Sequence, residues 1–515
     1  MAATAASSPA FARRRPMLQA IGFTLLAIGM IYAGFALFLG TRPVVIAFDP
    51  VKRFRDSLPK AAKPEDAAWP AYRDALVTLG WERGAQKDPA VSSALGDWPG
   101  QPGWTEVSKW VDAQQPAVAA ARAASKRPMF GFPLGQPLAG ADADFFRGVA
   151  DGSQLGQDVS NREHFPMFAV SLPYLGTLRG LSNVLLADMF RAGEQGDGER
   201  ATQDVEAVMA LSIHVSEGRL LISDLVSMAI RSLAQRGVLA MLEWKPEVFT
   251  DAQLKRLQVA LRSVPASLER IELSAERILF EDAVQRFYSD DGSGDGWFVP
   301  SWKQLQFLQE VSAASAGSRP WADARVWVYA TFVGALRPVG VWAVAGRRDT
   351  LDRHAEFMRS VEQVPNASPR EALAASKALD ARFGLDRSDP QAATRWFLQS
   401  VISPALANVT VTFARDRAHR QMACVAIAAE RFRRANKRWP KDAAELAAFD
   451  RGIDLLDPWG PGPILLSSEG SGFRMWSVSR DGTDDGGDLA SLSDFDEKGD
   501  WVFFAPRGNL NRWKN

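Results

Sequence analysis

The feature that most constrains this chain is a long uncharged stretch near its beginning. Residues 17–40 contain no charged residue in 24 positions. A helix of that length is about 36 Å long, and the hydrocarbon core of a bilayer is about 30 Å thick. The stretch is therefore predicted to be a retained transmembrane helix. It would follow a short cytoplasmic tail, residues 1–16, and precede a linker rich in Pro and Lys, residues 41–64.

The charges beside this stretch predict its orientation. Three arginines at positions 13–15 directly precede it, which favours a cytoplasmic N-terminus and places the rest of the chain outside the cytoplasm. Four basic residues between 42 and 55 weaken that asymmetry. A cleaved signal peptide is the alternative, with Gly34 and Ala36 as small cleavage-site residues, but signal cores usually have only about 7–15 apolar residues. The sequence thus favours a single-pass protein of the inner membrane.

A second apolar stretch, residues 326–346, bears on this topology. Arg337 and Pro338 interrupt its centre, and a charge there costs roughly 2.5–3.5 kcal/mol on insertion scales. We interpret it as two buried helices. The alternative is a second membrane span, which would return the C-terminal region to the cytoplasm.

Composition excludes several classes of protein. The chain is 47% hydrophobic and 23% charged, which is ordinary for a globular protein. Its 60 basic residues balance 60 acidic ones, so the whole-chain charge gives no reason to expect a nucleic-acid partner. A single cysteine, Cys424, excludes an internal disulfide framework and a zinc site built from several thiolates.

Residues 65–400 are expected to form a large helical body. Ala68, Tyr72, Leu76 and Leu79 recur at helical spacing and predict an amphipathic helix over 65–79. An irregular excursion broken by Pro and Gly is expected at 128–165. Short breaks between the later helices favour stacked antiparallel pairs. These helices are predicted at 166–192, 199–216, 219–244, 251–264 and 266–288.

The sequence offers no local catalytic signature. Its four histidines are scattered, and phosphate-loop, nucleophile-elbow and HExxH patterns are absent. Cys424 lies in an apolar helical run and is expected to be a buried structural residue. The protein is therefore not expected to be an enzyme. The alternative is a membrane-anchored enzyme whose site assembles from distant residues, with His164 or His214 beside carboxylates.

The loop at 289–297, SDDGSGDGW, begins like a calcium-binding loop. Asp291, Ser293 and Asp295 alternate, but Trp302 stands where the twelfth-position Glu of such a loop would be. We interpret this segment as a solvated turn.

The segment 404–515 is predicted to be a small α+β module. A long helix over 404–436 has a basic end, and a short helix follows at 442–448. The runs ILLSS, FRMWSVS and DWVFFAP are expected to be strands of an antiparallel sheet. The acidic loop RDGTDDGGD stands before the last strand.

This module resembles the head of the major pseudopilin of type II secretion. The likeness rests on AAERFRRANKRWPKDAAELAAF, with Trp439 and Pro440 at its break, and on the DPWG turn and SVSRDGTDDGG. The resemblance implies a loop that binds calcium, with the metal-ligand candidates Asp481, Asp484, Asp485 and Asp488. A solvated acidic turn without metal is the alternative.

The rest of the chain departs from pseudopilins, because about 360 residues separate Gly40 from the long C-terminal helix. The whole arrangement is similar to a family of anchored envelope proteins common in planctomycetes, on the residues FPMFAVSLPYLGTLRGLSNVLLADMFRAGEQGDGERA and DDGSGDG. We therefore expect a mainly α, envelope-facing structural or interaction protein. Its partners would be the membrane and another envelope protein. A secretion-filament accessory is a further alternative.

Overall fold

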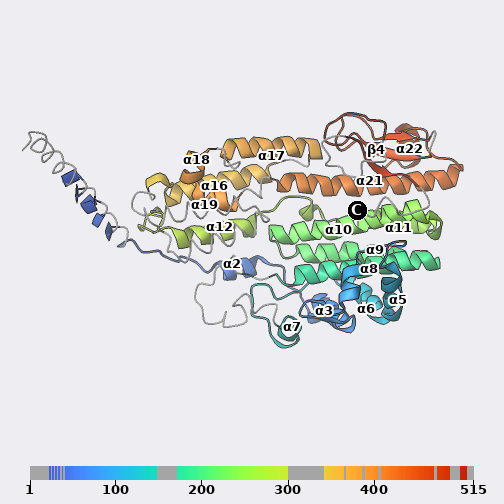
Figure 1. Ribbon diagram of the computed structural model, residues 1–515, viewed down its shortest axis with the longest axis horizontal. Coiled ribbons are helices and arrows are strands. Elements are labelled where there is room, and N and C mark those ends of the chain that lie inside the picture. Colours follow the sequence, from blue (N-terminus) through green and yellow to red (C-terminus); the bar gives the residue numbers. More distant parts are fainter. Residues whose placement is uncertain are drawn as a thin grey trace, which may run out of the picture. The chain divides into compact units, whose positions relative to one another are not determined.

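The computed structural model shows a mainly helical chain, as the sequence predicts (Figure 1). It describes residues 41–147, 172–299, 342–364, 367–384, 389–403, 408–468, 472–487 and 499–506, with single residues between 23 and 38 and at 167 and 170. Two compact units divide the chain. One comprises Met1–Ala47, Phe280–Phe357 and Phe383–Pro404, and the other Phe48–Leu279, Met358–Arg382 and Ala405–Asn515.

The second unit begins with short helices packed around aromatic side chains. Trp69 stacks on Phe146 with ring centroids 5.6 Å apart, and Phe132 meets it edge-on. The helix predicted over 65–79 is observed as the shorter α3 (Trp69–Thr78), after a separate 3-10 turn at Pro64–Asp66, and its four predicted apolar residues are buried. The elements are α2 (Pro50–Ser57), α3 (Trp69–Thr78), β1 (Trp81–Glu82), β2 (Ala85–Gln86), α4 (Pro89–Ala94), α5 (Trp104–Ala113), α6 (Gln115–Ser125) and α7 (Gly140–Phe145). The excursion predicted at 128–165 is described as far as residue 147, and its remainder, 148–165, lies outside the described residues.

Long helices then stack side by side: α8 (Tyr174–Gln195), α9 (Gly198–Ser216), α10 (Leu221–Trp244) and α11 (Asp251–Arg262). Their boundaries follow from local signals. Gly196 ends α8 in the left-handed conformation with φ 78°, and the Asp197 carboxylate caps α9. Thr250 and Gln253 form a capping box at the start of α11.

Two predicted helices begin later than expected, and the one predicted over 166–192 is observed as α8, from Tyr174 to Gln195. The sequence predicts a helix over 266–288, but α12 spans Ser274–Phe287. The Leu273 amide instead donates to the Glu362 carboxylate at 3.3 Å, which ties the preceding backbone to a distant helix. A local contact also marks the start, because the Ser274 amide donates to the Glu272 carboxylate at 3.1 Å, and Ala266–Leu268 forms a separate 3-10 helix.

Among the described residues, α10 is the one helix that is long and apolar enough to cross a membrane. It is an internal helix, and 67% of its most apolar 18-residue window is buried in the protein. It also carries the buried polar side chains Arg231, Gln235 and Glu243. These properties are typical of a core helix. The span predicted at 17–40 is described only at single residues, and most of the second apolar stretch, 326–341, lies outside the described part.

The remaining helices are α16 (Arg347–Glu362), α17 (Pro369–Phe383), α18 (Pro390–Arg395), α19 (Phe397–Ile402), α21 (Val409–Asn436) and α22 (Ala443–Phe449). In the first unit, Phe280, Phe287, Phe298 and Phe397 share one core. The helix predicted over 404–436 is observed as α21, from Val409 to Asn436, and residues 404–407 lie outside the described part.

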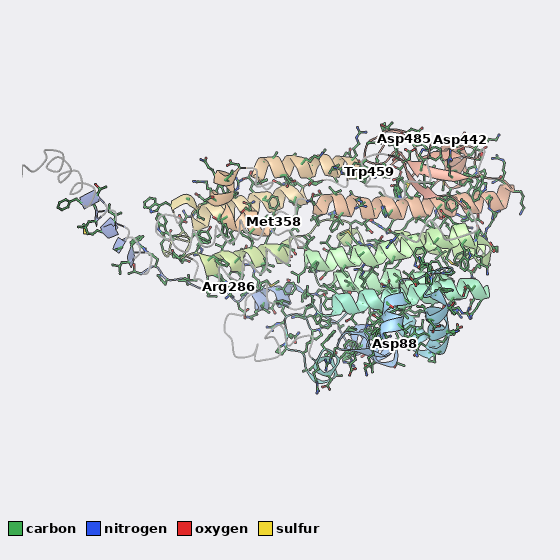
Figure 2. The ribbon with its side chains drawn as sticks, viewed as in Figure 1. Asp88, Arg286, Met358, Asp442, Trp459 and Asp485 are labelled. Carbon is green, nitrogen blue, oxygen red and sulfur yellow. The ribbon has the colours of Figure 1, made fainter. Side chains whose placement is uncertain are left out.

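The three predicted C-terminal strands are confirmed as an antiparallel sheet in the order β3 (Leu465–Ser467), β4 (Arg474–Ser477) and β5 (Trp501–Phe504). Met475, Phe503 and Phe504 belong to the same core as the α21 residues 422–429. The Ala505 amide donates to the Glu243 carboxylate of α10 at 2.7 Å. The C-terminal sheet, whose surroundings include the labelled Asp442, Trp459 and Asp485 in Figure 2, therefore shares its core with the helical body.

Two helical glycines make the tightness of this core testable. A Cβ at Gly198 would collide with the Val248 backbone carbonyl, whereas no atom lies within 4 Å of a Cβ at Gly176. We expect Gly198→Ala to lower the free energy of unfolding by about 1–3 kcal/mol. Gly176→Ala should raise it by about 0.5–1 kcal/mol through helix propensity. Chemical denaturation of both variants measures the difference, and equal effects would contradict the packing described.

Candidate functional site

The predicted calcium loop follows β4, and its carboxylates are largely engaged in shaping the loop. Asp481 accepts a hydrogen bond from the Thr483 amide at 2.9 Å. Asp484 accepts one from the Trp476 indole at 3.1 Å and one from the Gly486 amide at 3.0 Å. The Asp485 side chain is exposed, and Asp488 lies outside the described residues.

A glycine fixes the course of this loop. Gly487 has φ 68°, and a Cβ there would lie 2.7 Å from the Trp476 ring. Only glycine satisfies both the left-handed backbone and the close approach to the ring. The loop therefore folds back over β4.

Asp500, directly before β5, is a candidate site residue that no local sequence pattern indicates. It is fully buried, and its Oδ2 accepts hydrogen bonds from the Asp485 amide at 2.9 Å and the Gly487 amide at 2.7 Å. Its Oδ1 is buried without a hydrogen-bond partner among the described residues. Burial raises the pKa of Asp500, and the negative charges of Asp484 and Asp485 raise it further. A cation beside this oxygen would lower the pKa of Asp500 again.

The described part of the loop does not by itself form a complete metal cage. No three acidic, His or Cys side chains are grouped to hold an ion within the part of the chain that the structure covers. Carboxylate and carbonyl oxygens are nonetheless the donors that a hard cation such as Ca²⁺ takes. Calcium at this loop stays a prediction, with Asp500 added to the candidate ligands.

The DPWG turn has a structural role. The buried Asp457 accepts hydrogen bonds from the Trp459 amide at 2.8 Å and the Gly460 amide at 3.1 Å. It also accepts from the Ser477 hydroxyl at 2.5 Å and the Val478 amide at 3.0 Å. This carboxylate therefore fastens the turn to β4. The sequence pattern that indicates this role is an Asp directly before turn residues.

In the other acidic loop, at 289–297, arginines supply the positive charge. Asp290 pairs with Arg347, and this pair lowers the pKa of the Asp290 carboxyl. Asp291 accepts hydrogen bonds from the Ser293 amide and hydroxyl, both at 2.8 Å. Asp295 accepts the Arg348 amide at 3.1 Å. The loop thus has the turn geometry expected, closed by the start of α16.

His214, one of the two histidines considered for an enzyme site, belongs to a sealed hydrogen-bond network. Its Nε2 donates to the Arg127 carbonyl at 2.9 Å, so its Nδ1 accepts from the Tyr72 hydroxyl at 3.0 Å. The ring is 4% exposed, and burial lowers its pKa to about 4. Both nitrogens therefore serve to join α3, α9 and the segment before Phe130. His164 lies outside the described residues.

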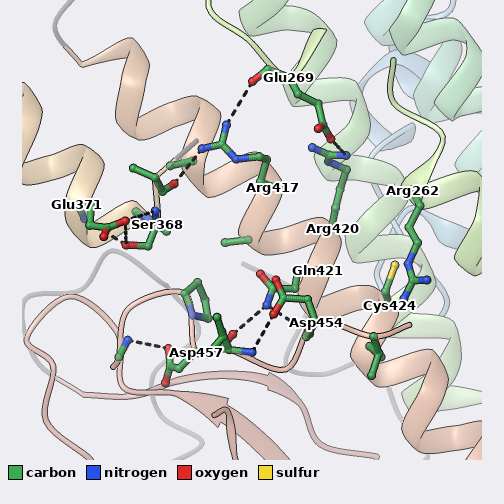
Figure 3. A pocket seen from close by; sticks show the side chains of 18 of the residues that line it. Arg262, Glu269, Ser368, Glu371, Arg417, Arg420, Gln421, Cys424, Asp454 and Asp457 are labelled. Atoms are coloured by element: carbon green, nitrogen blue, oxygen red, sulfur yellow. Dashed lines mark hydrogen bonds and ion pairs between the residues drawn. The ribbon is translucent and has the colours of Figure 1, made fainter. Parts of the chain in front are cut away.

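A hollow of about 640 Å³, lined by both polar and apolar side chains, opens along α21 (Figure 3). We call it the α21 hollow. Its walls come from the end of α11, the start of α17 and the turn at 452–461. Cys424 lies at one end of it, is 3% exposed as the sequence predicts, and has a pKa raised by burial. This hollow joins side chains that are distant in the sequence.

Comparison of the chain with protein-family models, curated proteins and solved structures gave no significant match.

The His214 network predicts a specific loss of stability in acid. The ring pKa is about 4 in the folded state and 6.5 in the reference state, so the unfolded chain binds the proton more readily between these values. The contribution of neutral His214 to the free energy of unfolding is fully present above pH 6.5. It is lost as the pH decreases to 4, by about 3 kcal/mol in total. Urea unfolding across this range measures it.

His214→Gln is the control, because the Gln amide can still donate to the Arg127 carbonyl but does not titrate. Its free energy of unfolding should fall less than that of the natural chain between pH 6.5 and pH 4. Identical pH profiles would show that His214 is not buried in neutral form.

Proposed function

We propose that this protein is a single-pass, membrane-anchored structural or interaction protein of the cell envelope. Residues 17–40 would cross the inner membrane, with the bulk of the chain outside the cytoplasm. The observation that carries the proposal is exposed apolar surface. Helical residues between 23 and 38 leave large side chains uncovered, with Phe23 and Ile31 each 73% exposed and Met30 62% exposed. A lipid environment would cover such side chains.

The helical body suits an interaction role. Its consecutive helices pack around one core that includes the C-terminal sheet, which gives a firm support for surface loops. The module at 404–515, similar to a pseudopilin head, would be the part that meets another envelope protein. Its acidic loop would bind calcium through Asp481, Asp484, Asp485 and Asp488. The buried Asp500 oxygen supports this part of the proposal.

The topology is tested with two reporters fused after Asn515. A reporter active only outside the cytoplasm should be active, and a reporter active only in the cytoplasm should be silent. Deleting residues 17–40 is the matched control, because it removes the apolar stretch and should release the fusion from the membrane fraction and reverse both signals. The opposite pattern in the natural chain would overturn the proposed orientation.

Calcium binding is tested by thermal unfolding of the full chain in detergent. The isolated module is unsuitable, because α21 packs against α10 and α11. Millimolar calcium should raise the melting temperature, since a ligand at 100 times its Kd stabilises the folded state by about 2.7 kcal/mol. Asp485→Asn should reduce the shift, because it removes the negative charge of a candidate ligand. The side chain is exposed and Asn has nearly the same shape, so the fold should be kept.

Asp454→Asn is the control for Asp485→Asn. Asp454 also lies in a turn of this region, where its Oδ1 accepts the Leu456 amide at 3.0 Å, and Asn can make the same bond. It should leave the calcium shift unchanged. Absence of any shift in the natural chain, or equal shifts in both variants, would count against calcium at this loop.

A further inference from the structure

Two aspartates meet inside the helical body, and we propose that at neutral pH they share one proton, carried by Asp204. Asp188 belongs to α8 and Asp204 to α9, and both side chains are completely buried. They meet where α6, α8 and α9 pack against one another, and we call this contact the aspartate joint (Figure 1). A shared proton makes the joint sensitive to pH. The inference is independent of the membrane anchor and of calcium.

One arginine nitrogen binds both carboxylates. Nη1 of Arg122, from α6, donates to Asp188 Oδ2 at 2.6 Å and to Asp204 Oδ1 at 2.7 Å. Because both oxygens lie within hydrogen-bond distance of the same atom, the two carboxylates are close neighbours. Two carboxylates that share a site disfavour each other's ionised form, so that one of them keeps its proton.

The other donors of the aspartate joint are divided unequally between the two aspartates. Gln115 Nε2 donates to Asp188 Oδ1 at 2.6 Å, and Arg200 Nε lies 3.5 Å from Asp188 Oδ2. Asp204 has only the shared Arg122 as a donor among the described residues, and its Oδ2 is buried without a hydrogen-bond partner. Asp188 is therefore the ionised member of the pair, and Asp204 is the member that carries the proton.

The charges around Asp204 lead to the same assignment. Burial raises the pKa of Asp204 well above its usual value, and the negative charge of Asp188 raises it further, against the opposing effect of Arg122. Hydrogen bonding to Asp188 also raises the pKa of Asp204. An ionised carboxylate can only accept a hydrogen bond, so a bond between two carboxyl groups requires a proton on one of them.

Charged side chains on the neighbouring helices are engaged in other contacts. They contribute no counter-charge to Asp204, whose charged neighbours among the described residues are Asp188 and Arg122. These other contacts are Arg191 with Asp112 and Glu194, Arg256 with Glu206, Arg231 with Asp416, Glu243 with the Ala505 amide, and Arg236 beside Arg179.

The sign of the pH effect follows from the raised pKa of Asp204. The folded chain keeps a proton on Asp204 that the unfolded chain releases near pH 3.8. The contribution of Asp204 to stability is therefore fully present below that value, and it is lost as the pH rises towards the folded-state pKa. The aspartate joint weakens as the pH increases. His214 titrates with the opposite sign, so each variant is compared with the natural chain at the same pH.

Asp204→Asn tests the proposal, because an amide has the shape of the protonated acid. Its carbonyl can accept from Arg122, and its NH₂ group can donate to Asp188. At pH 7 the full chain in detergent should melt about 2 °C or more above the natural chain. This excess should shrink as the pH approaches 4, where the natural chain no longer gives up a proton on unfolding. A lower melting temperature at pH 7 would show that Asp204 is ionised and overturn the proposal.

Asp188→Asn is the matched control, since it makes the same chemical change on the facing helix. It removes the charge that Arg122 and Arg200 contact, and its NH₂ group would oppose these donors. This variant should melt below the natural chain at pH 7. Equal shifts in the two variants, or a higher melting temperature for Asp188→Asn, would contradict the assignment of the proton to Asp204.

Infrared spectroscopy at pH 7 gives a readout that does not depend on unfolding. The spectrum of the natural chain minus that of Asp204→Asn should contain the C=O band of a protonated carboxyl group. Loss of an ionised carboxylate band in the variant would instead overturn the proposal, whatever the two melting temperatures are.

Discussion

The burial of α21 between the helical body and the C-terminal sheet is the constraint on which the other features of the second unit depend. This helix packs against α10 and α11 and also contacts β5. Its residues 422–429 are buried and mostly small, which allows close approach of its neighbours. Because one helix contributes to both sides, the acidic loop, the DPWG turn and the α21 hollow are positioned by the same packing.

Buried charges specify how the helices meet. Arg122 of α6 donates to Asp188 of α8 at 2.6 Å and to Asp204 of α9 at 2.7 Å. Burial raises the pKa of Asp204, and the nearby Asp188 charge raises it further. Between α10 and α21, Arg231 pairs with Asp416 at 3.1 Å. Such groups add little net stability, but removing one partner is costly, so they disfavour any other helix arrangement.

Much of the local structure was predictable. The helices at 199–216 and 219–244 and the three C-terminal strands follow from apolar periodicity and from turn residues, which act over a few positions. The start of α12 was predicted too early, because Ala266–Leu268 forms a separate 3-10 helix and the Leu273 amide donates to Glu362 of a distant helix. The candidate loop was visible as a run of aspartates. Asp500 was not, because its importance comes from loop amides that fold onto it.

The sequence by itself determined that the chain is mainly helical, that it has a small antiparallel sheet near its end, and that Cys424 is buried. These are consequences of contiguous residues and their periodicity. Only the tertiary structure decided that His214 is sealed between Tyr72 and a carbonyl, and that Arg262 and Arg417 share one hollow. The reason is physical: a side chain's solvation and charge partners are fixed by packing between segments far apart in the chain, and no local pattern encodes that arrangement.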